Sequence, residues 1–133
     1  MMTHLLYPSN PLRPRQPDEQ FAAEVDAVRN AGFEISLFSV ENLQAGEFRP
    51  VPALPRGLDA LYRGWMLSAS EYETFCSALV QTGARPLVLP DAYVASHYLP
   101  NWYPHIKDLT PETRIYPPDC DLAEGVHSVV EKP

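Results

Sequence analysis

The sequence predicts an α/β protein with a small, open, mostly parallel sheet of four to five strands flanked by helices. Short apolar runs and amphipathic segments follow one another in the order strand, helix, strand, strand, helix, strand, which is typical of this class. The 133 residues, of which 45% are hydrophobic, fit one globular domain. The 15 prolines are about twice the usual share and predict short elements joined by ordered loops.

The N-terminal third predicts one strand and one helix. The strand is expected over residues 4–7, and the proline-rich residues 9–19 are expected to form an irregular loop. Pro17 and Asp18 are typical of a helix start, and the Asn, Ala and Gly at 30–32 of a helix end. The apolar face of this helix carries Phe21, Val25 and Val28.

Two strands are predicted in the middle of the chain. Apolar and polar residues alternate over 33–40, which indicates a strand. Residues 41–57, with three prolines and two glycines, predict an irregular connection with at most a weak helical turn near Asn42. A further strand is expected over residues 58–66.

A second helix follows this strand. Ser68 and Ser70 are suitable caps, because each has a glutamate three residues later. The helix is expected to end near Gly83, and residues 86–89 then form a short apolar strand. Its buried face is predicted to carry Tyr72, Phe75, Cys76, Leu79 and Val80.

Residues 89–113 combine rings, four prolines and titratable side chains with little apolar periodicity. The prolines prevent one long helix, and the rings are costly to leave in water, so the segment is a candidate site. Stacking of its rings on one another is the alternative explanation. The pair His97 and His105 does not predict a zinc site, because prolines separate them and no cysteine or acidic residue completes the set.

The C-terminal part predicts a few short elements. Thr110 and Pro111 resemble the start of a brief helical turn, residues 114–116 could add an edge strand, and residues 121–130 have helical periodicity. The final Glu-Lys-Pro is expected to lead into a further domain, so that the chain would be a fragment.

Charge and apolar runs disfavour two classes of partner. The net charge is -7 with a pI near 4.9, and the longest basic cluster is the pair Arg13 and Arg15, which disfavours nucleic acid. No signal peptide and no long apolar segment is apparent, so we expect a cytoplasmic protein without membrane contact. Cys76 and Cys120 lack the spacing of a metal or redox motif and are expected to be reduced thiols.

The first candidate site lies at the end of the strand predicted over residues 58–66. In open α/β sheets ligands bind at the carboxyl ends of strands, and an arginine there can hold a carboxylate or phosphate with two hydrogen bonds. Arg63 is therefore the preferred binding residue, with Tyr62 and Trp65 beside it and Gly64 allowing close approach of a backbone. The alternative is that Arg63 pairs with a structural carboxylate and Trp65 fills the core.

Two other places are weaker candidates. Ser9, Asn10 and Arg13 follow the first strand, but that loop has no glycine to cradle a pyrophosphate, and a solvated loop is favoured. The aromatic segment offers His97 and Asn101, and also His105, Lys107 and Asp108. No serine or cysteine has a nucleophile motif, so no catalytic residue is predicted.

Four stretches carry a resemblance to a known family: LYRGWML from Leu61, the pair Leu89 and Pro90, SHYLPNWYP from Ser96, and DLTPET from Asp108. Together they resemble the N-terminal, pre-ATP-grasp domain of ATP-grasp proteins from a bacterial and phage clade similar to peptide ligases. The resemblance runs from LLYPSN to about Tyr116. It implies a small Rossmann-like pre-ATP-grasp domain over residues 1–116, with residues 117–133 forming a short helix or linker into an ATP-grasp core.

ATP-grasp enzymes join a carboxylate to an amine through an acyl phosphate, with ATP and magnesium. The resemblance implies that the intact protein is such a ligase, whereas this chain by itself holds no cofactor and is inactive. Its partner would be the missing ATP-grasp core or a partner subunit, and a homo-oligomer could form through an uncovered edge. The residues that would support binding of the acceptor substrate are Arg63, Tyr62, Trp65, Asn101, Trp102, Tyr103 and His97.

A second function, from another class, also fits the sequence. The chain could be a free-standing interaction or regulatory module whose aromatic residues 89–113 bind a protein partner. A reading frame that continues beyond Pro133 into an ATP-grasp core would favour the ligase, and a stop codon there would favour the module.

Overall fold

The computed structural model describes residues 3–117 and 119 of the chain. The chain divides into two compact units, Met1–Val94 and Ala95–Pro133, and the whole sheet belongs to the first. Across residues 3–117 and 119, no helix is both long enough and apolar enough to cross a lipid bilayer.

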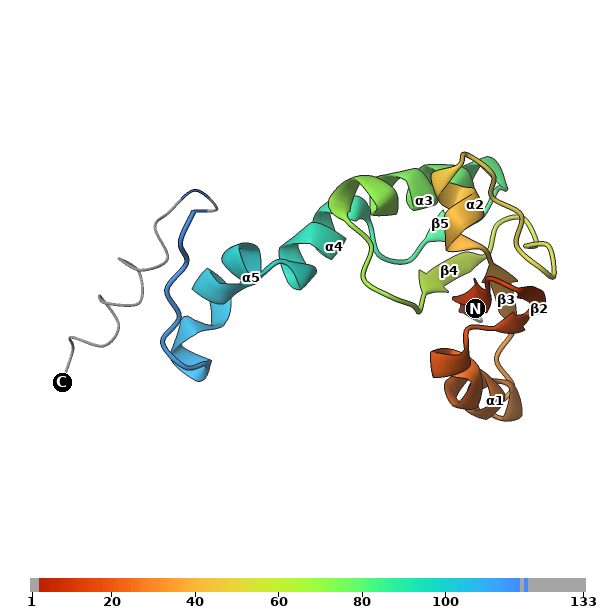
Figure 1. The fold of residues 1–133 in the computed structure, drawn as a ribbon, viewed down its shortest axis with the longest axis horizontal. Coiled ribbons are helices and arrows are strands. Elements are labelled where there is room, and N and C mark those ends of the chain that lie inside the picture. The colour runs from red at the N-terminus through yellow and green to blue at the C-terminus, as the bar shows by residue number, and fades with distance from the viewer. Residues whose placement is uncertain (1–2, 118, 120–133) are drawn as a thin grey trace. The chain divides into compact units, whose positions relative to one another are not determined.

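The first unit contains an open sheet of five strands around β1 (Figure 1). β1 pairs in parallel with β3 and with β4, and β4 pairs in parallel with β5. β2 instead returns antiparallel to β1. The strands are β1 (His4–Asn10), β2 (Arg13–Pro17), β3 (Ile35–Phe38), β4 (Asp59–Tyr62) and β5 (Arg85–Pro86). The α/β class and the small open sheet are confirmed, while the expectation of a mostly parallel sheet holds only in part.

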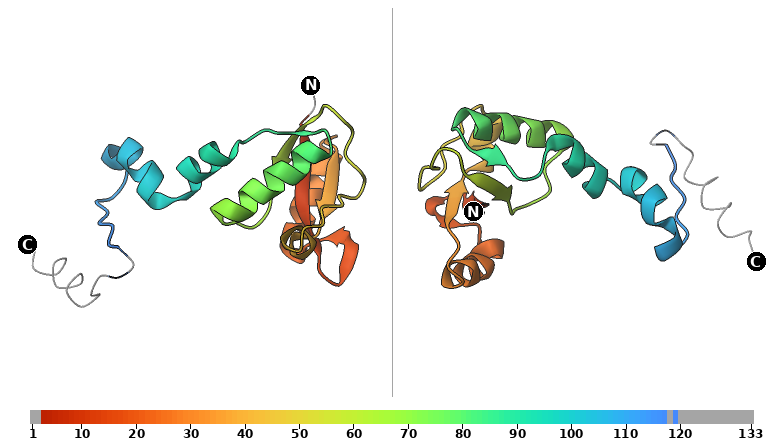
Figure 2. Two further views of the ribbon diagram at one scale, coloured as in Figure 1. Left: turned by 90° about the horizontal axis from the view of Figure 1, so that it is seen from above. Right: turned by 180° about the vertical axis from the view of Figure 1, so that it is seen from behind.

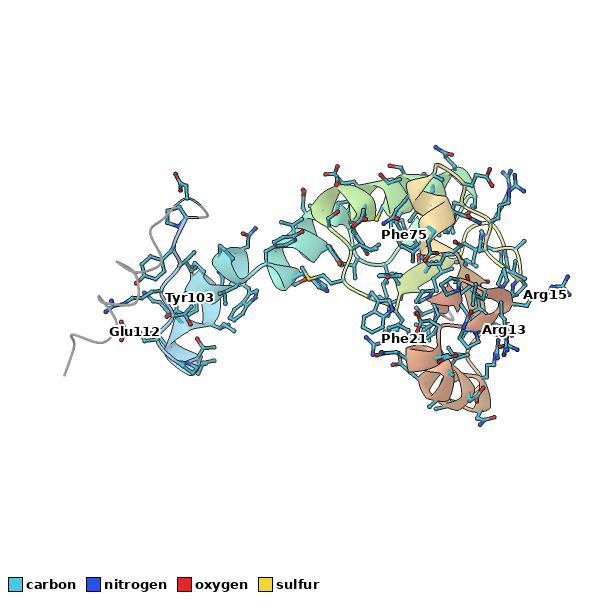
Figure 3. The ribbon with its side chains drawn as sticks, viewed as in Figure 1. Arg13, Arg15, Phe21, Phe75, Tyr103 and Glu112 are labelled. Carbon is cyan, nitrogen blue, oxygen red and sulfur yellow. The ribbon has the colours of Figure 1, made fainter. Side chains whose placement is uncertain are left out.

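Helices cover both faces of this sheet (Figures 1 and 2). The helical segments of the first unit are η1 (Glu19–Phe21), α1 (Ala22–Asn30), α2 (Val40–Gln44) and α3 (Ala69–Gln81), and α4 (Pro90–His97) begins there. Because neighbouring residues of a strand point to opposite faces, Leu6 of β1 joins the core under α2 and α3. Tyr7 joins Val25 of α1 in a second core. Phe21 and Phe75 accordingly lie on opposite sides of the sheet (Figure 3).

The core under α2 and α3 is built mainly from aromatic rings. Phe75 of α3 stacks on Phe38 of β3 with ring centroids 5.5 Å apart. Tyr72 stacks on Tyr93 of α4 at 3.7 Å, and the Tyr93 hydroxyl both accepts from the Leu67 backbone N–H at 2.9 Å and donates to its carbonyl at 3.0 Å. These rings fix α3 and the start of α4 against the sheet.

The second predicted helix is confirmed as α3, with its start as expected. Ser68 is the N-cap, and its hydroxyl and the Glu71 side chain form a reciprocal capping box. Four of the five residues expected on the buried face are buried, whereas Val80 is exposed. The turn after the helix places Gly83 at a φ of 89°, a conformation that favours glycine.

The loop predicted over residues 9–19 is wrong, since β1 continues to Asn10 and β2 pairs back onto it. The Asn10 side-chain carbonyl accepts from the backbone N–H groups of Leu12 and Arg13 at 2.9 and 3.1 Å, which closes a tight turn. β2 is an exposed edge strand. It therefore lacks the alternating apolar pattern from which a strand is predicted.

The connection predicted over residues 41–57 is more ordered than expected. Ser39 caps the short helix α2 by accepting from the Asn42 N–H at 3.0 Å, and Leu43 of this helix is buried. Val51 forms an antiparallel bridge with Leu37. The strand predicted over residues 58–66 is shorter in the structure, as β4. The strand predicted over residues 86–89 is misplaced, because β5 is Arg85–Pro86 and shares only Pro86 with it.

The second unit is helical where the structure describes it. α5 (Leu99–Ile106) leads into η2 (Lys107–Leu109). The helical turn predicted to begin at Thr110 is wrong, because Thr110 is extended and ends η2. The edge strand predicted over residues 114–116 is also wrong, since residues 95–117 contain no strand with which it could pair. The helix predicted over residues 121–130 lies outside the described residues.

Candidate functional site

The candidate site lies at the carboxyl end of β4, beside the middle of the neighbouring parallel strand β1. Parallel strands present their carboxyl ends at the same edge of a sheet, and loops at that edge bind ligands in open α/β folds. Arg63 directly follows β4, and its backbone N–H donates to the Leu6 carbonyl of β1 at 2.8 Å. The sheet itself therefore fixes the starting point of the Arg63 side chain.

Arg63 forms a two-pronged ion pair with Glu24 of α1. Its Nε donates to Glu24 Oε1 at 2.8 Å and its Nη2 donates to Glu24 Oε2 at 2.9 Å. The two side chains are 52% and 35% exposed, so the pair is accessible to solvent. Arg63 thus pairs with a carboxylate of the fold, as the first half of the alternative explanation expected.

Tyr7 holds this carboxylate from the other side. Its ring is completely buried, and its hydroxyl donates to Glu24 Oε1 at 2.7 Å. Burial, followed by the bond to Glu24, raises the pKa of Tyr7, so the phenol keeps its proton. The hydrogen bond from Arg63, followed by that from Tyr7, lowers the pKa of Glu24, which stays ionised at neutral pH. Three elements thus fix the orientation of one guanidinium.

Arg63 still has capacity for another anion. A guanidinium has five N–H groups, of which two bind Glu24, and the remaining three have no partner among the described residues. A carboxylate or one face of a phosphate matches that geometry. The ion pair with Glu24 neutralises the charge locally, which favours a singly charged group over a dianion.

Trp65 follows Arg63 by two residues and is half-exposed. Its indole N–H donates to Asp18 Oδ2 at 3.3 Å, and its ring meets the ring of Phe21 edge-on with centroids 5.3 Å apart. Because 47% of Trp65 is exposed, it does not fill the core as the alternative expected. An exposed indole beside a positioned guanidinium can pack on the apolar part of a small ligand.

Tyr62 shapes the loop after β4. Its ring packs against Phe75 with centroids 5.3 Å apart, and its hydroxyl donates to the Trp65 carbonyl at 2.7 Å. A Cβ at Gly64 would collide with that hydroxyl, so Gly64 is required by the fold of its own loop. Burial raises the pKa of Tyr62, which keeps it a neutral donor.

The other four expected site residues belong to the second unit. His97 lies in α4, where its Nδ1 is 3.2 Å from the Ser96 hydroxyl. Trp102 and Tyr103 of α5 meet edge-on with centroids 6.4 Å apart, and Asn101 precedes them. The Tyr103 hydroxyl accepts from the Thr113 N–H at 3.0 Å. Tyr103 therefore supports the segment after α5.

Three residues of the site escaped the prediction from sequence. Glu24 and Asp18 were ordinary polar positions of a helix and its cap, and Tyr7 was an apolar strand residue. The only local signal was an ionisable ring, Tyr7, in a strand expected to be buried, since a buried hydroxyl needs a partner. Ser9 and Asn10, by contrast, serve the hairpin, where Asn10 closes the turn.

The remaining reactive groups do not extend the site. Cys76 is buried in the core of α3, and burial raises the pKa of its thiol to about 11. Cys120 lies outside the described residues. Over residues 3–117 and 119, no three side chains of the metal-binding types His, Cys, Asp and Glu gather at one place.

Comparison of the chain with protein-family models, with curated proteins and with solved structures found no match.

Proposed function

We propose that this chain is the N-terminal domain of an ATP-grasp carboxylate–amine ligase, in which it supports binding of the acceptor substrate. The observation that carries the proposal is Arg63, which sits at the carboxyl end of β4 with two N–H groups fixed by Glu24 and three left over. The stretch LYRGWML, which contributes to the resemblance, includes β4 residues and this arginine.

In this role Arg63 binds a carboxylate of the acceptor, and Trp65 packs on its apolar part. Glu24 and Tyr7 position the guanidinium, and the ligand binds the three Arg63 N–H groups that Glu24 leaves unoccupied. Holding the acceptor in one orientation lowers the entropic cost of its attack on the activated carboxylate. The attack itself, with ATP and magnesium, takes place in a core outside this domain. This role places the protein in the cytoplasm, where ATP is available.

ATP does not fit the residues at this edge of the sheet. The turn after β1 has no glycine, and Asn10 already accepts from the backbone N–H groups of Leu12 and Arg13. Glu24 also places a carboxylate beside the only arginine of the site, which repels a triphosphate. We therefore assign no nucleotide to this chain, and calorimetry should find no heat of ATP binding. Micromolar affinity for ATP would contradict this assignment.

The ligase proposal is tested with the gene and with the whole enzyme. The reading frame should continue beyond the codon for Pro133 into an ATP-grasp core, and a stop codon there would contradict the proposal. In the whole enzyme, Arg63→Ala should raise the KM for the acceptor about tenfold or more, because a hydrogen bond to a charged group contributes about 1.5–3 kcal/mol. Phosphate release measures the rate.

The matched control is Arg85→Ala. Arg85 also forms an ion pair at 2.8 Å, with Asp59, and its side chain is as exposed as that of Arg63. It lies in β5, away from the carboxyl end of β4. Loss of activity in both variants to the same degree would show that the effect of Arg63→Ala is not specific to the site.

A second candidate is a protein-interaction module that uses residues 89–113. It is favoured by exposed apolar side chains in and after α5, namely Leu99, Ile106 and Leu109. If this is the function, Leu109→Ser should weaken binding to a partner recovered with the whole protein, while Arg63→Ala should leave that binding unchanged. The opposite pattern would contradict the module.

A further inference from the structure

A groove runs along α2 and α3, on the face of the sheet opposite α1. It consists of two adjoining hollows of about 160 and about 450 Å³. Both hollows are bordered by Leu43, Ser70 and Thr74, so they lie next to each other. The groove uses none of the residues of the Arg63 site.

The floor of the groove is apolar and firmly held. Leu43 and Leu67 belong to the buried core, and Val40 and Phe48 pack against that core. The ring of Phe48 meets the ring of Phe75 edge-on with centroids 5.9 Å apart. Because Leu43 and Leu67 are buried, the apolar surface that a partner can reach comes from the half-buried Val40 and Phe48.

The wall formed by α3 is lined by short side chains. Ser70, Thr74, Ser77 and Ala78 follow one another at the spacing of one helix face, and Gln81 ends the row. Eleven residues separate the first from the last, which corresponds to about 17 Å along the helix axis. An open face of this length can accept about three turns of a partner helix packed closely against it.

The charge of the lining decides what kind of helix fits. Glu71 and Glu73 are its charged residues, and neither hollow is lined by a lysine, arginine or histidine. Glu71 is occupied by Ser68 and by Gln44 Nε2, which donates to its carboxylate at 2.6 Å. Glu73 is exposed and has no ion-pair partner among the described residues. A second copy of this chain would bring like charges together, because its net charge is -7.

We propose that this groove binds a basic amphipathic helix of a partner protein. Its aliphatic side chains would pack on Val40, Phe48 and Ala78, and a lysine or arginine would pair with Glu73. This is the helix-in-groove mode of recognition, in which an apolar face gives affinity and the charged rim gives selectivity.

A synthetic helix tests the proposal on the 133-residue chain. The probe is a fluorescein-labelled peptide of about 12 residues, with leucine and alanine on one helical face and lysine on the other. Its anisotropy should rise saturably with protein concentration. A matched peptide with glutamate in place of lysine should bind about tenfold more weakly or not at all.

Two variants of the groove and one control complete the experiment. Ser77→Trp fills the groove and Glu73→Lys reverses the charge of its rim, so each should weaken binding about tenfold. Asp26→Lys makes the same change in net charge on α1 and should leave affinity within about twofold. Far-ultraviolet circular dichroism checks that the variants are folded. Absence of saturable binding, or equal weakening by Asp26→Lys and Glu73→Lys, would overturn the proposal.

Discussion

The two faces of the sheet are stabilised in different ways. Under α2 and α3, the buried core holds eleven residues, among them Phe38, Tyr72, Phe75 and Tyr93. Under α1, it holds four, and one of these, Tyr7, directs its hydroxyl to Glu24. The first face thus depends on apolar burial, whereas the second adds a polar network that reaches the solvent at Arg63.

One face of the sheet therefore mainly stabilises the fold, and the other carries the group that can bind a ligand. Buried rings contribute most of the free energy of folding but offer no group to a ligand. We expect the network of Tyr7, Glu24 and Arg63 to contribute less stability, and its hydrogen bonds orient one exposed guanidinium. A domain of this size can hold a positioned cation because the opposite face supplies the core.

The largest expected effect breaks the core under α3. Phe75→Ala removes a ring that contacts the rings of Phe38, Phe48, Tyr62 and Tyr72. It should lower the free energy of unfolding by about 3–5 kcal/mol. Urea denaturation followed by circular dichroism measures this loss.

The matched variant on the other face is Val25→Ala. Val25 is fully buried in α1 but lies in the smaller core, and its replacement should cost less, about 1.5–3 kcal/mol. Should Phe75→Ala leave too little folded protein, Phe75→Leu provides a milder step in the same place. Equal losses of free energy of unfolding for Val25→Ala and Phe75→Ala would contradict the claim that the core under α3 contributes more stability than the core under α1.

An intermediate effect is expected when one tyrosine hydroxyl is removed from each face of the sheet. Tyr7→Phe removes a donor to the charged Glu24 and should cost about 1.5–3 kcal/mol. Tyr72→Phe removes a donor to the neutral Val88 carbonyl, 3.0 Å away, and should cost about 0.5–1.5 kcal/mol. Urea denaturation measures both losses in the free energy of unfolding. A larger loss for Tyr72→Phe than for Tyr7→Phe would contradict a stabilising role of the network.

The smallest effect concerns the pH dependence of the network. The pKa of Glu24 is lower in the folded protein than its ordinary value of 4.5, because Arg63 and then Tyr7 donate to its carboxylate. Its stabilising contribution is therefore present above about pH 4.5 and is lost as the pH falls through the folded pKa. Glu24→Gln should be less stable than wild type by about 0.2–1 kcal/mol at pH 7.

The difference between wild type and Glu24→Gln should shrink as the pH falls below about 4.5. Midpoints of urea unfolding measured between pH 7 and pH 3 test this. Asp26→Asn is the control, because Asp26 is exposed on the same helix and has no ion pair among the described residues. A difference that stays constant over this range would mean that Glu24 acts through packing and not through its charge.

Elements with strong local signals could be predicted from the sequence. Helix α3 has a capping box and a row of apolar residues at helical spacing, and both signals operate within a few residues. Strand β2 has neither, because its residues are exposed and its existence depends on the turn at Asn10. The strand expected over residues 114–116 has the opposite problem. Its residues have a suitable pattern, but a strand also needs a neighbouring strand to pair with, and the pattern does not show whether one is present.

The sequence by itself determined the α/β class, the order of the main elements and the position of Arg63 near the end of a strand. Only the tertiary structure decided that Arg63 meets Glu24, 39 residues away, and that Tyr7 holds the same carboxylate from 17 residues away. Caps and periodicity act between near neighbours in the chain, whereas the partner of a charged side chain depends on which elements the topology brings together. The candidate site is a product of that topology.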